Sequence, residues 1–248
     1  MRKILVVGIG VGDPGHLTQS AAQALASADV VFIPDKGDEK GDLKAARLDL
    51  ARRFVRAGHT RFVEFAVPPR DRRPANYHAT VLDWHATIAD VYAQAFHRHL
   101  GDDGCGALLV WGDPSLYDST LRILATVEAR VALDIHVFPG ITAIQALCAR
   151  HRIPLNEIGG SVLITTGRAL ASGWPAGVGS LVVMLDGDAA FTRFDETALI
   201  FWGAYLGTPD ELLVAGRLDA VAEEIVAVRR EARERKGWMF DTYLLRRP

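Results

Sequence analysis

The sequence contains little cysteine: only Cys105 and Cys148 occur among its 248 residues. Two cysteines cannot build the disulfide framework of a small secreted domain, and no Cys-x-x-Cys pair is present. The chain also lacks a His-Glu-x-x-His motif and the paired cysteine and histidine spacing of a zinc site. We therefore expect no bound metal, and we interpret both cysteines as reduced residues that fill the core.

The sequence also lacks a strong excess of charge and any long apolar run. Its formal net charge of −2 argues against a general attraction to nucleic acid or anionic membranes, so an anionic partner would need a local basic group. No run of 18 apolar residues occurs, and no membrane span is expected. The apolar run after Lys3 is interrupted at Gly8 and Gly10, too early for a signal peptide. We expect a cytoplasmic protein without a nucleic-acid or membrane partner.

Short runs of valine, isoleucine and leucine alternate with segments whose apolar residues recur at helical spacing. This alternation predicts an α/β protein, and continuous apolar blocks such as 107–111 are typical of a parallel sheet between helices. A turn at 112–114 predicts a boundary between an N-terminal α/β domain (1–113) and a C-terminal one (114–248). Helices are predicted to start at Thr18, Asp42, Asn76, Thr142 and Asp219. The predicted strands are Lys3–Ile9, Asp29–Ile33, Arg61–Phe65, Gly106–Trp111, Asp134–Phe138, Ser161–Thr165, Ser180–Leu185, Thr197–Trp202 and Glu211–Ala215.

A glycine-rich turn, Gly8-Ile9-Gly10-Val11-Gly12-Asp13-Pro14-Gly15, follows the first predicted strand. Because glycine has no Cβ, such a turn lets a ligand approach the backbone closely. A dinucleotide-binding turn would read G-x-G-x-x-G, whereas the spacing here is G-x-G-x-G and Asp13 would repel a pyrophosphate. A structural turn and a nucleotide-binding loop both remain alternatives for this segment by itself. The lysine pattern of a P-loop is absent.

Three further motifs stand where predicted strands end. Gly112-Asp113-Pro114 follows an apolar strand, and ligands of open α/β sheets bind at such carboxyl ends. Pro139-Gly140-Ile141-Thr142-Ala143 closes a strand and opens a helix, and Met184 lies near the end of another strand. Taken singly, these motifs are also explained by a proline turn, a helix cap and a core methionine.

Together and in this order, the four motifs resemble those of the tetrapyrrole methylase family. That family carries a V-x-G-x-G-P-G-D start, a G-D-P turn, a P-G-[IV]-[ST]-[AS] turn and a strand with methionine near its end. The resemblance covers essentially the whole chain, with Val11 where the family commonly has proline. It implies two α/β domains with a trough between them, S-adenosylmethionine bound at the domain junction, and a homodimer.

The resemblance also implies which residues contact the cofactor. The family's cofactor positions correspond here to Val11, Trp111, Gly112, Asp113, Leu116, Thr142, Ala143, Met184 and Gly207. Segments outside the shared motifs favour a member that acts on a corrin precursor, and they are Pro34–Gly37 with Lys40–Arg53, Tyr77–His85 and Lys236–Asp241. The implied reaction is methylation of precorrin-5 at ring carbon C-1, with release of the C-20 acetyl group as acetate and of S-adenosylhomocysteine.

Loss of an acetyl group sets a chemical demand that methyl transfer does not. The sulfonium is already activated, so the protein mainly aligns the reacting atoms and excludes water. Addition of water to the acetyl carbonyl would be helped by a general base. The candidate bases are Asp13, Asp35, His85 and Asp113.

A polycarboxylated tetrapyrrole also requires cations in its binding site. Residues 34–73 hold 11 Lys and Arg against 7 Asp and Glu, a net charge of +4. Arginine and lysine of this segment would bind carboxylates, although some of them can equally form the solvated face of a helix. The candidates are Lys36, Lys40, Lys44, Arg47, Arg70, Arg72 and Arg73.

Two other functions stay open. A methylase of the same fold could act on another tetrapyrrole, on a diphthamide precursor or on ribosomal RNA, although the modest charge disfavours RNA. A non-catalytic protein that binds a nucleotide at 8–15 would bind nucleotide and transfer no methyl group.

Overall fold

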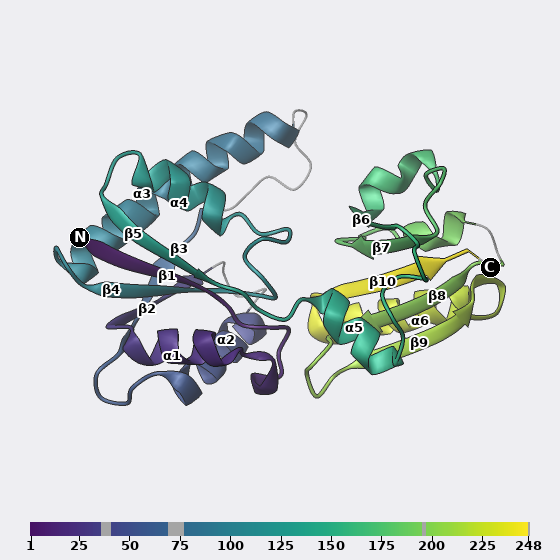
Figure 1. Cartoon of the computed structure of the whole chain (residues 1–248), viewed down its shortest axis with the longest axis horizontal. Coiled ribbons are helices and arrows are strands. Elements are labelled where there is room, and N and C mark those ends of the chain that lie inside the picture. The colour runs from purple at the N-terminus through teal and green to yellow at the C-terminus, as the bar shows by residue number, and fades with distance from the viewer. Residues whose placement is uncertain (36–40, 69–76, 195–196, 248) are drawn as a thin grey trace. The chain divides into compact units, whose positions relative to one another are not determined.

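The computed structural model of the protein describes residues 1–35, 41–68, 77–194 and 197–247 (Figure 1). The chain forms two compact units, Met1–Ile141 and Thr142–Pro248, each built on a five-stranded sheet. The division thus follows Ile141 rather than residue 113, the predicted boundary. The reason is that β5 (Leu133–Phe138) pairs with β1 (Arg2–Gly8) and so completes the sheet of the first unit.

The first sheet is entirely parallel, in the order β3-β2-β4-β1-β5. Its remaining strands are β2 (Val30–Asp35), β3 (Arg61–Ala66) and β4 (Cys105–Val110). Figure 1 shows that helices cover both faces of this sheet, as the apolar blocks predicted. They are α1 (Gln19–Ser27) and α2 (Gly41–Phe54) on one face, and α3 (Tyr77–Leu100) and α4 (Thr120–Glu128) on the other.

Strand β1 explains why both faces are covered. Ile4 and Val6 belong to the core beneath α3 and α4, whereas Leu5 and Val7 belong to the core beneath α1 and α2. All four side chains are at most 3% exposed. A strand that is apolar on both faces is stable only when helices cover each face.

The second sheet is mixed, in the order β6-β7-β10-β8-β9. Strands β6 and β7 are parallel, and β10 is antiparallel to both β7 and β8. The strands are β6 (Val162–Thr166), β7 (Ser180–Met184), β8 (Leu199–Ala204), β9 (Leu212–Arg217) and β10 (Asp241–Arg246). The unit also contains α5 (Ala143–His151), α6 (Leu218–Lys236) and the short helices η3 (Gly167–Ser172) and η4 (Ala190–Arg193).

The nine predicted strands are confirmed, with ends that agree within two residues. Of the α-helices and strands in the described residues, helix α4 and strand β10 were not predicted. Strand β10 has only a brief apolar run, Tyr243 to Leu245, between Asp241 and Arg246, and it becomes the central strand of its sheet through pairing with β7 and β8. In the described part of the chain, no helix combines the length and the apolar character that crossing a membrane would need.

Candidate active site

Three glycines meet at the carboxyl edge of the first sheet, where β1, β4 and β5 end side by side. A Cβ on Gly8 would lie 2.6 Å from the backbone nitrogen of Gly140 and 2.8 Å from the carbonyl oxygen of Gly112. A Cβ on Gly140 would clash with that same carbonyl oxygen. The predicted glycine motifs therefore pack backbone against backbone, which no larger residue permits.

The glycine-rich loop is also joined to the end of β4. The Gly112 amide donates to the Gly10 carbonyl oxygen at 2.7 Å, and the Gly10 amide donates back at 3.4 Å. Both residues have positive φ, 72° for Gly10 and 66° for Gly112, in the region that favours glycine. This pairing holds Val11, which is partly exposed, at the same edge as Trp111 and Gly112.

The Asp113 carboxylate connects two of these segments. Its Oδ2 accepts a hydrogen bond from the Gly140 amide at 2.9 Å, and its Oδ1 accepts from the amide and the hydroxyl of Ser115. Burial raises the pKa of Asp113, but these hydrogen bonds outweigh it and the pKa lies below its ordinary value. Asp113 is thus a weak proton acceptor with a structural role, and its carbonyl accepts from the Leu116 amide at 3.2 Å.

The other candidate bases occupy different surroundings. Asp13 is exposed and caps the short helix η1 (Pro14–His16) through a 2.7 Å bond from the Gly15 amide to its Oδ1. His85 is buried on α3 at 7% exposure, and its ring lies 5.6 Å from the ring of Trp84. The Trp84 indole donates to the Pro68 carbonyl beyond β3, so this part of α3 lies toward the carboxyl edge of the sheet.

Two of the seven predicted substrate cations, Lys44 and Arg47, lie in the described part of α2. The Lys44 ammonium pairs with Glu64 at 2.5 Å and with Asp35 at 3.2 Å. These hydrogen bonds, first that of Glu64, raise the pKa of Lys44. Lys44 and the candidate base Asp35 are therefore bound to each other. The remaining cations, Lys36, Lys40, Arg70, Arg72 and Arg73, lie outside the described residues.

In the second unit, Thr142 caps helix α5. Its hydroxyl accepts a hydrogen bond from the Ile144 amide at 3.1 Å, while the side chain of Gln145 accepts from the Thr142 amide at 3.0 Å. This reciprocal arrangement is a capping box, and it explains why Thr142 is only 9% exposed. Ala143 is the first residue of the helix.

Met184 and Gly207 lie at the carboxyl ends of two strands of the second sheet. Because β7 and β8 are both antiparallel to β10, they run in the same direction and end at the same edge. Met184 is the last residue of β7, and the Gly207 amide, just beyond β8, donates to Glu211 at 3.0 Å. Arg150 of α5 holds the other oxygen of Glu211 at 2.5 Å.

Helix α5 begins at this same edge. Leu147 lies against Gly203 of β8, and the ring of His151, one turn later, contacts the Trp202 carbonyl oxygen at 3.0 Å. The helix therefore runs opposite to β8, so its first residues lie toward the carboxyl end of that strand. Within the second unit, the predicted cofactor positions Thr142, Ala143, Met184 and Gly207 thus gather at one edge of the sheet.

The profile of one protein family, described as tetrapyrrole (corrin/porphyrin) methylases, matches residues 3–222. The chain belongs to the tetrapyrrole methylases.

Relatives of this methylase agree with that assignment. A precorrin-6A synthase (deacetylating) from Sinorhizobium sp is 52% identical over 250 residues, which cover 100% of this chain and 96% of the relative. A cobalamin synthesis related protein (CobF) from Corynebacterium diphtheriae has a TM-score of 0.84 and 37% identity, over 99% of this chain and 98% of that one. A uroporphyrin-III C-methyltransferase from Thermus thermophilus, complexed with S-adenosylhomocysteine, shares the fold with a TM-score of 0.58 and 22% identity, over 98% and 91% of the two chains.

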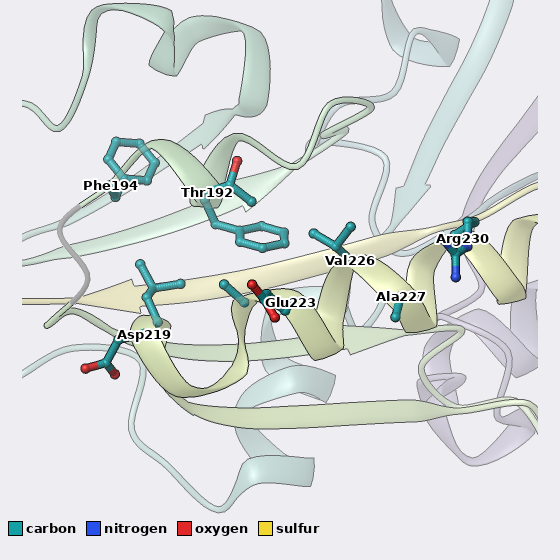
Figure 2. Close-up of a pocket in the computed structure, with 10 residues that line it drawn as sticks. Thr192, Phe194, Asp219, Glu223, Val226, Ala227 and Arg230 are labelled. Carbon is teal, nitrogen blue, oxygen red and sulfur yellow. The ribbon is translucent and has the colours of Figure 1, made fainter.

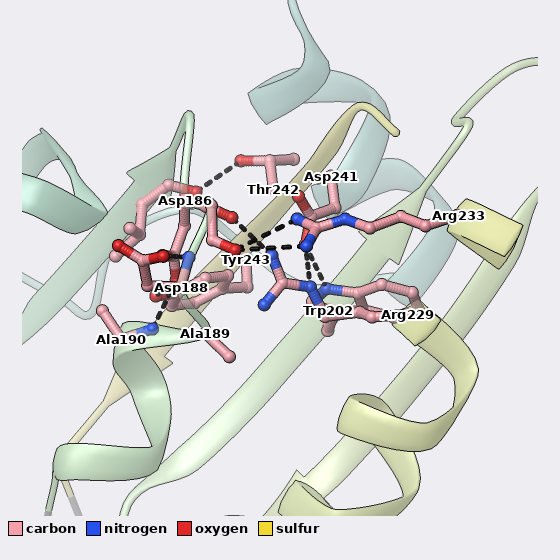
Figure 3. Close-up of polar contacts among 12 residues, drawn as sticks. Asp186, Asp188, Ala189, Ala190, Trp202, Arg229, Arg233, Asp241, Thr242 and Tyr243 are labelled. Atoms are coloured by element: carbon pink, nitrogen blue, oxygen red, sulfur yellow. Dashed lines mark hydrogen bonds and ion pairs between the residues drawn. The ribbon is translucent and has the colours of Figure 1, made fainter. Parts of the chain in front are cut away.

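A buried polar network of the methylase, absent from the predicted site, surrounds Asp186, which follows Met184 by two residues (Figure 3). Arg229 of α6 and Asp241 of β10 form an ion pair at 2.9 Å, with both side chains 5% exposed. Asp241 also accepts from the Trp202 indole at 2.9 Å, and Asp186 accepts from the Tyr243 hydroxyl at 2.7 Å. Burial raises the pKa of Asp241, and the charge of Arg229 acts against this.

The network fixes the segment that follows Met184. Arg229 donates to the carbonyl oxygen of Asp186, and the Asp186 carboxylate caps η4 through the Ala190 amide at 2.7 Å. Leu185, which lies between Met184 and Asp186, has a φ of 53°, which residues other than glycine rarely adopt. Such strain persists only where surrounding contacts enforce it, and here the network supplies them. The charged residues of this network, Asp186, Arg229 and Asp241, are far apart in the sequence, and no local sequence pattern indicates that they meet.

A pocket of the methylase lies between η4 and α6 (Figure 2), and its lining residue Phe191 contacts Arg229 and Tyr243 of the network. It encloses about 520 Å³ and none of the predicted site residues line it. Phe191 and Val226 supply apolar surface, while Glu223 and Arg230 supply charge. The pocket thus belongs to a different part of the second unit than the edge that carries Met184.

Proposed function

We propose that this methylase is a precorrin-6A synthase (deacetylating) of cobalamin biosynthesis. It transfers the methyl group of S-adenosylmethionine to C-1 of precorrin-5 and releases the C-20 acetyl group as acetate, which gives precorrin-6A and S-adenosylhomocysteine. The observation that carries the proposal is the match to the Sinorhizobium precorrin-6A synthase, which extends over the whole chain at 52% identity.

S-adenosylmethionine supplies an activated methyl group, so the protein needs to hold and orient its ligands and exclude water. We assign the adenosine part to the edge of the second sheet, where Met184 and Gly207 are partly exposed. The turn after Met184 contains Leu185, whose φ of 53° is strained. The turn after β8 contains Gly207, whose φ of 73° is readily adopted by glycine. This fits a ligand that is recognised through backbone groups.

In the first unit we assign Val11, Trp111, Gly112, Asp113 and Leu116 to cofactor contacts. Because the Asp113 carboxylate is bound to Gly140 and Ser115, its contribution comes chiefly from the backbone of the Gly112–Asp113 turn. The hydroxyl of Thr142 is likewise used to cap α5. Asp113 and Thr142 therefore shape their turns, and this role differs from the direct polar contacts expected from their side chains.

Deacetylation requires water to add to the acetyl carbonyl, after which the bond from the tetrapyrrole to the acetyl carbon breaks, acetate leaves, and the electron pair of that bond stays on the tetrapyrrole. Of the four candidate bases we favour His85. An imidazole has an ordinary pKa near neutrality, which suits proton transfer, whereas the Asp113 carboxylate has a lowered pKa and Asp35 is paired with Lys44. His85→Gln should slow acetate release and leave S-adenosylhomocysteine affinity unchanged.

The deciding experiment is turnover of precorrin-5 with S-adenosylmethionine. We expect one acetate for each S-adenosylhomocysteine, measured by enzymatic acetate assay and mass spectrometry of the corrin product. Methylation of a different precorrin without acetate release would favour the same-fold alternative. Calorimetric titration with S-adenosylhomocysteine and, separately, ATP tests the nucleotide-binding alternative, which predicts binding of ATP alone.

We further propose that the enzyme is a cytoplasmic homodimer, as expected for its family. Light scattering after size-exclusion chromatography measures the mass directly. A mass equal to the 27.0 kDa of one chain would contradict the dimer.

A further inference from the structure

Arg47 and Trp111 place two buried N–H groups beside each other in the first unit. The Arg47 guanidinium of α2 lies over the Trp111 ring, with 5.7 Å from its Cζ to the ring centroid. Trp111 directly follows β4, at the edge where the glycine motifs meet. Arg47 Nε and Trp111 Nε1 are both buried, and among the described residues neither has a hydrogen-bond partner.

The positive charge of Arg47 is only weakly balanced. No carboxylate of the described residues lies within ion-pair distance of it. The charge of Asp118 acts on it from farther away, while the Asp118 carboxylate accepts from the Thr120 amide at 2.7 Å. Burial lowers the pKa of Arg47, and Asp118 and Tyr92 act against this. Arg47 as a residue is partly exposed, but its buried Nε lacks a hydrogen-bond partner among the described residues, which is unfavourable, so structural contacts alone do not explain its position.

Other cations of the chain show how it stabilises a positive charge for structural purposes. Arg229, which is 4% exposed whereas Arg47 is partly exposed, pairs with Asp241 at 2.9 Å and donates to the Asp186 carbonyl. Lys44, on the same helix as Arg47, contacts both Asp35 and Glu64. Arg47 has no such partner, although it stands beside the turn that carries Gly112.

We propose that Arg47 and Trp111 form a subsite that binds one carboxylate of the tetrapyrrole substrate. This inference rests on the proposed function, because the substrate supplies the carboxylate. The planar guanidinium binds the two oxygens of a carboxylate with paired hydrogen bonds, and the indole ring holds its plane by a cation–π contact. The indole N–H is a further donor beside it. Ligand binding gives both buried donors a partner.

The test combines ligand affinity with the stability of the free protein. Arg47→Met should weaken binding of uroporphyrin III, a porphyrin with carboxylate side chains, about 10- to 100-fold in a fluorescence titration. The melting temperature of the unliganded variant should stay equal or rise, because an unpaired buried cation is removed. Arg47→Lys keeps the positive charge but loses the planar guanidinium group. Its affinity for uroporphyrin III should lie between those of Arg47→Met and the wild type.

Matched controls separate this subsite from a general charge effect. Arg52→Met removes the same charge from an exposed position on α2 and should leave uroporphyrin affinity within twofold of wild type. Trp111→Phe keeps a ring under the guanidinium but removes the indole N–H, so a smaller loss of affinity is expected. The octamethyl ester of uroporphyrin III should bind wild type and Arg47→Met equally.

Three results would overturn the subsite. They are unchanged uroporphyrin affinity in Arg47→Met, absence of uroporphyrin binding by the wild type, and a melting temperature that falls as far as that of Arg229→Met. Failure of the proposed function has a different outcome, because wild-type protein would then release no acetate from precorrin-5, whatever its affinity for uroporphyrin III.

Discussion

The two sheet edges that carry the predicted cofactor positions are built in opposite ways. At the edge of the first sheet, three backbone segments touch because the residues at the contact are glycines, which have no side chain: Gly8, Gly112 and Gly140. At the edge of the second sheet, a buried ion pair, Arg229 with Asp241, holds the turn after Met184. One edge thus depends on close backbone packing and the other on buried charge, and different substitutions should damage each.

Removal of the buried cation should have the largest effect. Arg229→Met leaves the Asp241 carboxylate buried without its partner, which costs about 3–5 kcal/mol of unfolding free energy. Arg230→Met takes the same charge from the neighbouring, exposed position of α6 and should change stability by less than about 0.5 kcal/mol. Urea unfolding of both variants measures the difference, and equal stabilities would contradict a structural role for the ion pair.

A methyl group at the glycine contact should have the next largest effect. Gly140→Ala forces a Cβ into the Gly112 carbonyl oxygen and should destabilise the protein by about 1–3 kcal/mol. Gly179→Ala is the matched control, because nothing lies within 4 Å of its added Cβ. If both variants unfold at the same urea concentration, the three segments do not touch as described.

Loss of one hydroxyl from the second edge should have a smaller effect. Tyr243→Phe removes the hydrogen bond of 2.7 Å to Asp186 from a fully buried site and should cost about 1 kcal/mol. Tyr117→Phe removes a hydroxyl from a residue that is 45% exposed and should be neutral. The same urea experiment decides, and a neutral Tyr243→Phe would show that this bond contributes little.

The smallest effect is expected from the charge of Asp113. Its pKa is lowered from 3.8 in the folded protein, so its carboxylate favours folding above its unfolded pKa, and this contribution is lost as the pH falls through the lower folded pKa. Stability of the wild type should therefore fall more steeply between about pH 5 and pH 3 than that of Asp113→Asn. Asp103→Asn, at an exposed position, should follow the wild type. Parallel curves for all three would contradict the predicted linkage.

Much of the fold was predictable because it depends on local patterns. Apolar runs such as 107–110 and the cap at Thr18 are visible in a few consecutive residues, and the structure confirms both. Strand β10 was missed because its short apolar run becomes a central strand only by pairing with β7 and β8. The unit boundary was placed too early for a similar reason, since β5 joins the first sheet through β1.

The candidate site likewise has features that local sequence predicts and features that depend on distant residues. The motifs that contain Gly112 and Met184 stand out in the sequence, since glycine turns and strand ends have local patterns. What the side chains do there depends on partners far away, as with Asp113 and Gly140. The unpartnered donor of Arg47 is likewise invisible in the sequence, where it is one cation among many in 34–73.

The sequence by itself determined the α/β class and nine of the strands, because these follow from the spacing of apolar residues, and it indicated the family through the resemblance of its four motifs. Tertiary structure alone decided which charges are paired. Arg229 and Arg47 look alike in sequence, yet among the described residues a buried carboxylate pairs with Arg229 and none pairs with Arg47. The physical reason is that burial makes a charge depend on neighbours brought together by folding, and local sequence does not specify those neighbours.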